Sequence, residues 1–309
     1  MTTECVVKDE QQPTVEQQAT YLRREWELRQ RFLKGGLPPE WVLDQLQAAM
    51  EFGGNWLERI LNRERQCYRQ FFGQEFDLEI LAEKLQAYGE EKIQQQWKKL
   101  GLEPHFLPQI LLAQDSTFPG WKVKPEKWFY QEVDAGEILR QHNGGSLVVD
   151  HDACQLEGIA VLIDTRLKPA YDNGQQMYKD YNLLGPVVER LRQEGKISNH
   201  TPQTSRFNVS ADEGEKTVRP ALAEFIGLPT DQLRLERTIE ANVISQLYPN
   251  MPRKNDGQTN TWVWYEEYFS GRGFRLRGGD AVFGGLAFVN HSVAGSHWVY
   301  ESFRPLAVL

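Results

Sequence analysis

The chain has 309 residues, 40% hydrophobic and 25% charged, which is typical of one large or two ordinary globular domains with buried cores. The formal net charge of -8 disfavours nucleic acid as a partner, because phosphates attract basic surfaces. No apolar run is long enough to cross a bilayer, and residues 1–12 are polar and acidic, unlike a secretion signal. We therefore expect a cytoplasmic protein without a membrane span, with surface display by another route left open.

The three cysteines, Cys5, Cys67 and Cys154, lie far apart in the sequence. They form no CxxC pair, and no histidine stands at the spacing of a zinc site. We interpret them as reduced thiols, structural or incidental, unless the fold brings two of them together. We expect no cofactor and no metal centre.

The region from Thr14 to about Gly101 is rich in Gln, Glu, Arg, Lys and Leu, which favour helices. Pro38 and Pro39 suit a helix start, and a second helix is predicted from Asp77, as its cap, to Gly101. The apolar stripes of these two helices are Trp41, Leu43, Leu46, Ala49, Phe52, Trp56 and Ile60, and then Ile80, Leu81, Leu85, Tyr88, Ile93 and Trp97. Such stripes indicate either packing within the chain or a docking or homo-oligomerisation module, and the sequence does not separate the two.

The composition changes between Ser116 and Lys127, where prolines and a glycine interrupt the helical pattern. We therefore expect a helical domain over residues 1–119 and a second domain over residues 120–309.

The second domain combines predicted strands and helices. Residues 146–150 and 159–165 are short runs rich in β-branched residues, as in buried strands. Helices are predicted over residues 185–195 and 218–225, each followed or ended by a glycine, and from Gln258 onward the chain reads as loop and strand. The predicted fold class is α+β.

Four landmarks follow in order toward the C-terminus. They are Leu233-Arg234-Leu235 followed by Glu240, Thr261-Trp262-Val263-Trp264 with Glu266, Arg277-Gly278-Gly279, and Ser302-Phe303-Arg304-Pro305. In this order they resemble the C-type-lectin-like core shared by formylglycine-generating (sulfatase-modifying) enzymes and the variable proteins of diversity-generating retroelements. The resemblance covers roughly Ile159 to Leu309, including residues 162–171, and implies a C-type-lectin-like domain. Where the sulfatase-modifying family reads Arg-Leu-Pro-Thr before its glutamate, Glu236 and Arg237 follow Leu235 here, a departure from the pattern.

The resemblance implies a rigid frame around the landmarks. Two tryptophans at i and i+2 lie on one side of a strand, and a glycine corner lets the backbone turn where a Cβ would clash. Phe303 is expected to pack inside in the last strand, and Arg304 to fork onto a buried carboxylate or onto carbonyls, such as those near Glu240 or Glu266. The frame residues are Trp262, Trp264, Arg277, Gly278, Gly279, Phe303 and Arg304.

Formylglycine-generating enzymes depend on a cysteine pair in this domain, whereas no cysteine follows Cys154 here. We therefore expect a binding protein and no enzyme. The alternative is a sulfatase-modifying-factor-like enzyme with altered chemistry that uses His291 or His297.

Residues 281–300 contain no Lys, Arg, Asp, Glu, Gln or Met, although a quarter of the chain is charged. The C-terminal region of retroelement variable proteins is diversified by adenine mutagenesis, mostly at AAY codons, which never yield Trp, Met, Lys, Glu or Gln. Apart from Trp298 the window obeys that rule, and Gly284, Gly285, Leu286 and Trp298 are expected to be scaffold. The expected diversified contacts are Val282, Phe283, Phe288, Asn290, His291, Ser292, Gly295, Ser296, His297 and Tyr300.

These residues predict a hypervariable, ligand-binding surface whose target is expected to be a protein. The competing interpretation for Phe288 and Val289 is that they are strand core. The final loops hold no dense acidic cluster, so we expect folding without calcium.

Overall fold

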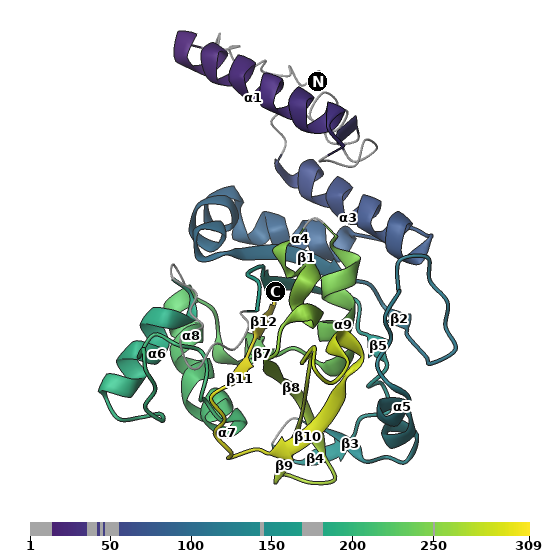
Figure 1. The fold of residues 1–309 in the computed structure, drawn as a ribbon, viewed down its shortest axis with the longest axis vertical. Coiled ribbons are helices and arrows are strands. Elements are labelled where there is room, and N and C mark those ends of the chain that lie inside the picture. Colours follow the sequence, from purple (N-terminus) through teal and green to yellow (C-terminus); the bar gives the residue numbers. More distant parts are fainter. Residues whose placement is uncertain are drawn as a thin grey trace, which may run out of the picture. The chain divides into compact units, whose positions relative to one another are not determined.

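The computed structural model describes residues 14–35, 42–43, 46, 56–142, 145–168, 182–249 and 251–309 (Figure 1). The chain divides into two compact units, Met1–Arg59 and Ile60–Leu309. Helices and sheets both contribute, so the α+β class is confirmed at this level.

Helix α1 (Val15–Leu33) is the main described element of the first unit. A capping box starts it: the backbone N–H of Gln17 donates to Thr14 Oγ1 (3.2 Å), and Thr14 N–H donates to Gln17 Oε1 (2.8 Å). None of its residues is buried. Of the stripe expected from Trp41 onward, Trp41, Ala49 and Phe52 lie outside the described residues, whereas Leu43 and Leu46 are exposed.

The second unit contains three sheets. A four-stranded sheet has the order β1 (Leu102–Leu107), β6 (Ile159–Asp164), β12 (Pro305–Val308) and β7 (Leu233–Leu235). A six-stranded sheet has the order β10 (Val289–Val293), β9 (Phe274–Gly278), β8 (Trp262–Phe269), β3 (Ile138–Gln141) and β4 (Leu147–Val149), with β11 (Glu301–Phe303) parallel to β8. The short pair is β2 (Ile110–Leu111) and β5 (Gln155–Leu156).

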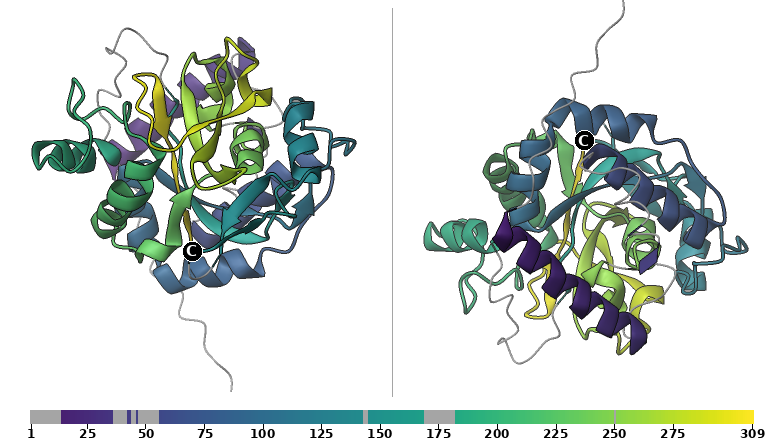
Figure 2. Two further views of the ribbon diagram at one scale, coloured as in Figure 1. Left: turned by 90° about the horizontal axis from the view of Figure 1, so that it is seen from below. Right: turned by 90° about the horizontal axis from the view of Figure 1, so that it is seen from above.

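The chain ends inside this unit. Strand β12 runs between β6 and β7, and its neighbour β11 belongs to the other large sheet, so Arg304 lies at the junction of the two sheets. Figure 2 marks this end of the chain with a C. Phe303 and Leu309 are buried, which confirms the expectation that Phe303 packs inside.

Helices and single turns surround the sheets. They are α3 (Trp56–Phe72), α4 (Glu79–Tyr88), η1 (Glu91–Trp97), η2 (Lys98–Leu100), α5 (Lys127–Asp134), α6 (Leu184–Gln193), α7 (Ala211–Glu213), η3 (Gly214–Val218), α8 (Arg219–Ile226), η4 (Thr230–Gln232), α9 (Thr238–Leu247), η5 (Pro252–Gln258) and η6 (Gly285–Ala287). Helices α6 and α8 confirm the two helices expected in the second domain, and β4 and β6 confirm its two early strands.

The helix expected from Asp77 to Gly101 is interrupted. Helix α4 ends at Gly89, which has a φ of 78°, and the chain continues as a π-helical and a 3₁₀ turn to Gly101. The residue at the capping position is Leu78 and not Asp77, although Asp77 accepts a hydrogen bond from Glu79 N–H (2.9 Å). The inward direction expected for Ile80 is wrong, since this side chain is 48% exposed, whereas Leu81 is fully buried.

The division between the units differs from the boundary expected at Gly120. Strand β1, which precedes that boundary, pairs along its whole length with β6, from Leu102 opposite Asp164 to Leu107 opposite Ile159. Gly120 N–H also donates to the carbonyl of Phe71 in α3 (2.9 Å). Residues 60–119 are therefore part of the second unit.

Candidate functional site

The expected display window, residues 281–300, includes edge strand β10 of the six-stranded sheet and the loops on either side of it. Strands β9 and β8 lie next to β10 in that sheet. Trp262 and Trp264 on β8 are both buried, and Trp264 Nε1–H donates to the carbonyl of Val209 (3.2 Å). On β10, Asn290 lies opposite Arg277 of β9, and side chains at opposed positions project to the same face of a sheet. Asn290 and Ser292 therefore share the face of Arg277, and His291 lies on the other face.

The loop between β9 and β10 is held by its backbone and by Asp280. The Asp280 carbonyl accepts from Phe283 N–H (3.2 Å) and Gly285 N–H (2.9 Å), and its carboxylate accepts from Val282 N–H (2.8 Å). Ala281 N–H donates to the carbonyl of Thr259 (2.7 Å). The side chains of Val282 and Phe283 take no part in these bonds, so they can change while the loop keeps its hydrogen bonds.

Two glycines of the site are required by close backbone approach. A Cβ on Gly278 would lie 2.2 Å from the carbonyl oxygen of Phe288. A Cβ on Gly285, whose φ is 64°, would lie 2.4 Å from the carbonyl oxygen of Gly257. Neither distance leaves room for another residue, so both glycines fix the course of the loop.

Polar side chains behind the loop anchor it. Asn242 of α9 donates from Nδ2 to the carbonyl of Leu286 (2.8 Å) and accepts from Trp121 Nε1–H (2.8 Å). Glu126 accepts from Val289 N–H (3.0 Å), and its own N–H donates to the carbonyl of Ala287 (2.8 Å). Sequence reasoning missed Asn242 and Glu126. A buried amide within the apolar run of residues 238–247 was the available signal for Asn242.

A buried lysine secures the Gly279 corner. Lys168 Nζ donates to the carbonyls of Thr261 and Gly279, both at 2.7 Å. Burial lowers the pKa of this amine to about 7. Sequence reasoning also missed this residue.

The ten expected contact residues all retain solvent exposure. Val282 and Phe283 are the most open, at 74% and 60% exposed. Gly295 and His297 are exposed, and the others are half-buried: Phe288, Asn290, His291, Ser292, Ser296 and Tyr300. Val289, by contrast, is 3% exposed, so strand core describes Val289 better than Phe288.

Aromatic rings cluster beside the loop. Phe283 stacks on Phe288, with ring centroids 5.2 Å apart, and the Phe288 ring lies 4.8 Å from that of Trp262. The Arg277 guanidinium lies over Trp262 at 4.1 Å and pairs with Glu301. In this cluster of Trp262, Arg277, Phe283 and Phe288, Trp262 is buried beneath the two phenylalanines, and Phe283 and Phe288 present aromatic area with few rotatable bonds to freeze on binding.

The two histidines of the window have separate environments. His291 stacks on Phe269, with centroids 4.2 Å apart, and burial lowers its pKa. His297 Nε2 lies 2.9 Å from a carboxylate oxygen of Glu213. Among the described residues, no group of three or more His, Cys, Asp or Glu side chains is placed to hold a metal ion.

A groove of about 630 Å³ borders the same loop. Its walls come from α9, η5, the segment around Lys122 and the loop itself at Gly284, Gly285 and Leu286. Lys122 and Lys254 are exposed at its rim. The groove adds a concave, basic margin to the aromatic cluster, suited to an acidic group on a ligand.

Two expectations about individual side chains are corrected. Arg304 pairs with Asp256 at 2.9 Å, as an ion pair rather than an aligned hydrogen bond, and not with Glu240 or Glu266. Glu240 is instead held by both terminal nitrogens of Arg234, at 2.7 and 2.6 Å. Trp298, expected in the frame, is 45% exposed and stacks on Tyr300.

No family model, curated protein or solved structure matches this chain.

The cysteines of the described residues are buried or half-buried. Burial raises the pKa of Cys67 and of Cys154 to about 12, which keeps both thiols protonated at neutral pH; Cys5 lies outside the described residues. Within the described ranges, no helix has the length and apolar character needed to cross a membrane.

Proposed function

We propose that this protein binds a target, expected to be another protein, through residues 281–300 of a C-type-lectin-like domain, and that a retroelement diversifies these residues. The observation that carries the proposal is the contrast between frame and window. Trp264, Phe303 and Arg304 are buried, whereas none of the ten expected contact residues is. Exposed side chains can vary at small cost in stability, and buried ones cannot.

The loop geometry supports the same proposal. Its hydrogen bonds come from the backbone and from Asp280, which is outside the window, so substitutions at Val282 and Phe283 leave them in place. The aromatic cluster supplies contact area, and the basic rim at Lys122 and Lys254 adds complementarity to an acidic target.

We propose a binding role in preference to formylglycine-generating chemistry because of the cysteines. A formylglycine-generating mechanism needs reactive thiolates, and the protonated, buried thiols of Cys67 and Cys154 do not provide them.

The genomic neighbourhood tests the proposal. We expect a reverse transcriptase gene and a near-copy of the segment that encodes residues 281–300. A neighbourhood without either would refute diversification by a retroelement.

A library tests the binding surface itself. The full chain is displayed with the ten expected contacts randomised, and a control library randomises exposed positions away from the window and its groove: Ile80, Leu111, Val148, Val149 and Phe225. Against a panel of unrelated proteins, we expect binders from the first library only. Equal yields from both libraries would contradict the assignment of the window.

A further inference from the structure

Helix α1 carries an apolar stripe on its surface. Val15, Leu22, Trp26 and Leu33 are 81%, 62%, 62% and 72% exposed. Their spacings of seven, four and seven residues place all four within about 40° of one another around the helix axis. They lie along one face of the helix, and this set of four is called the α1 stripe below.

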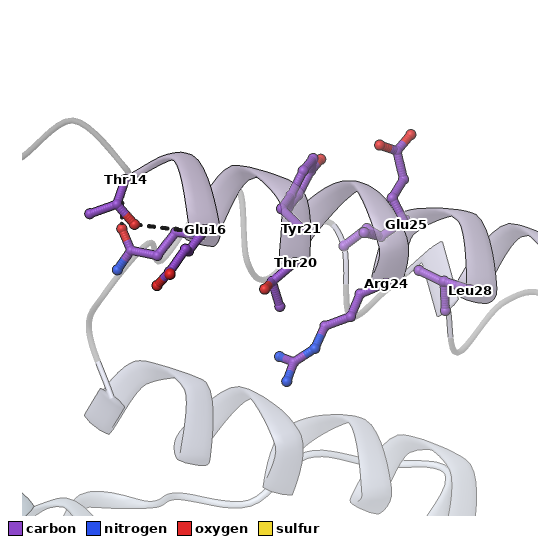
Figure 3. A pocket seen from close by; sticks show the side chains of 9 residues that line it. Thr14, Glu16, Thr20, Tyr21, Arg24, Glu25 and Leu28 are labelled. Carbon is purple, nitrogen blue, oxygen red and sulfur yellow. Dashed lines mark hydrogen bonds between the residues drawn. The ribbon is translucent and has the colours of Figure 1, made fainter.

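The α1 stripe is separate from the hollow on the same helix. That hollow, of about 710 Å³, is lined by other α1 side chains, including Thr20, Arg24 and Leu28 (Figure 3). Leu46 also lines it. No residue of the stripe lines it. Whatever occupies the hollow would leave the stripe uncovered.

An isolated helix of this length is marginally stable in water, and its stability in proteins comes mostly from packing of an apolar face. Helix α1 buries none of its residues. A surface line of this kind, including a tryptophan, is typical of a contact with another molecule.

The order of residues in the stripe is symmetric about position 24. If a second α1 lies alongside and runs in the opposite direction, Val15 meets Leu33 of the second copy and Leu22 meets Trp26. The same twofold axis generates each pair twice, once from each chain. Each pair joins a smaller side chain to a larger one. This is the self-complementarity that a twofold contact between identical chains requires.

The charges flanking the stripe fit the same arrangement. Glu16, Arg23, Glu27 and Lys34 lie on one flank of α1, at about 80–120° from the stripe. In the antiparallel pair, Glu16 lies within about 3 Å, along the axis, of the level of Lys34 of the second copy. A parallel pair would instead leave Glu16 a helix length away from Lys34.

We propose that the α1 stripe joins two copies of this chain through antiparallel packing of their α1 helices. The contact stands independently of the binding proposed for the C-terminal window. Together, they would place two display surfaces in one assembly, which adds avidity to individually weak contacts.

The test uses the full chain and measures its mass over a range of concentrations by sedimentation or light scattering. Wild type is expected to show a monomer–dimer equilibrium. Leu22→Glu removes two apolar contacts per dimer and is expected to weaken association at least about 100-fold. Tyr21→Glu is the matched control, because Tyr21 is 66% exposed on the same helix but lies outside the stripe, and its dimer should persist.

Charge reversal tests the direction of packing. Glu16→Lys and Lys34→Glu should each weaken the dimer, and the double variant should restore it. Unchanged thermal unfolding of monomeric Leu22→Glu shows that the variant is folded. A wild type that stays monomeric at every soluble concentration, or a Leu22→Glu chain that dimerises like wild type, overturns the proposal. A double variant weaker than both single variants overturns the antiparallel arrangement.

Discussion

Replacing Arg304 by Met should strongly destabilise the second unit. The side chain is 1% exposed and lies between the two large sheets, with its guanidinium 2.9 Å from an Asp256 carboxylate oxygen and 3.3 Å from the carbonyl of Asp164. Methionine fills much of the space but leaves the Asp256 carboxylate with a weaker partner, Arg253, at 3.4 Å. Removing one member of a buried ion pair costs about 3–5 kcal/mol. That is a large fraction of the stability of a typical domain.

The free energy of unfolding is measured by urea denaturation, followed by the fluorescence of the nine tryptophans. Arg304→Lys keeps the charge but loses the planar fork, so its stability should fall between those of wild type and Arg304→Met. The control is Arg190→Met, since Arg190 is exposed on α6, and its stability should stay within about 0.5 kcal/mol of wild type. An Arg304→Met chain as stable as this control would refute the assignment of Arg304 to the frame.

Three further predictions concern pH and calcium. Burial alone would raise the pKa of Glu64, but the neighbouring His105 and Arg63 lower it to about 2, from an ordinary value of 4.5. Glu64 therefore stabilises the fold above pH 4.5 and loses that contribution toward pH 2, so unfolding of Glu64→Gln should depend less on pH over this interval. Burial lowers the pKa of Lys168 in the folded protein to about 7, from an ordinary value of 10.5. Between pH 7 and 10.5 the unfolded chain therefore binds more protons at this amine than the folded protein does. Wild-type stability should then rise between these pH values by more than that of Lys168→Met; equal slopes would contradict the burial of this amine. Chelation of calcium should leave the melting temperature unchanged, and a marked drop would show a calcium site that folding requires.

Local sequence signals predicted the helices that are followed by a glycine. Gly195 and Gly227 end α6 and α8 near the expected positions, because glycine at a positive φ is a local property of the chain. The break at Gly89 had the same kind of signal, but the good helix formers on both sides outweighed it in the prediction.

Long-range pairing was not predictable in the same way. The place of β1 in the second unit depends on its pairing with β6, more than fifty residues later, which no local pattern encodes. The prediction of the partner of Arg304 was wrong for a similar reason. Its burial follows from its position between two buried strands, but Asp256 comes near it only through the turn η5.

The central claim is that residues 281–300 vary while their frame is fixed, and deep sequencing of this gene across its natural population tests it most directly. The account predicts that substitutions concentrate between Val282 and Tyr300, follow adenine positions in the codons, and spare Gly278, Gly285 and Trp264. Variation spread evenly along the chain, with His291 and His297 invariant, would contradict the account and point to a constrained site in their place.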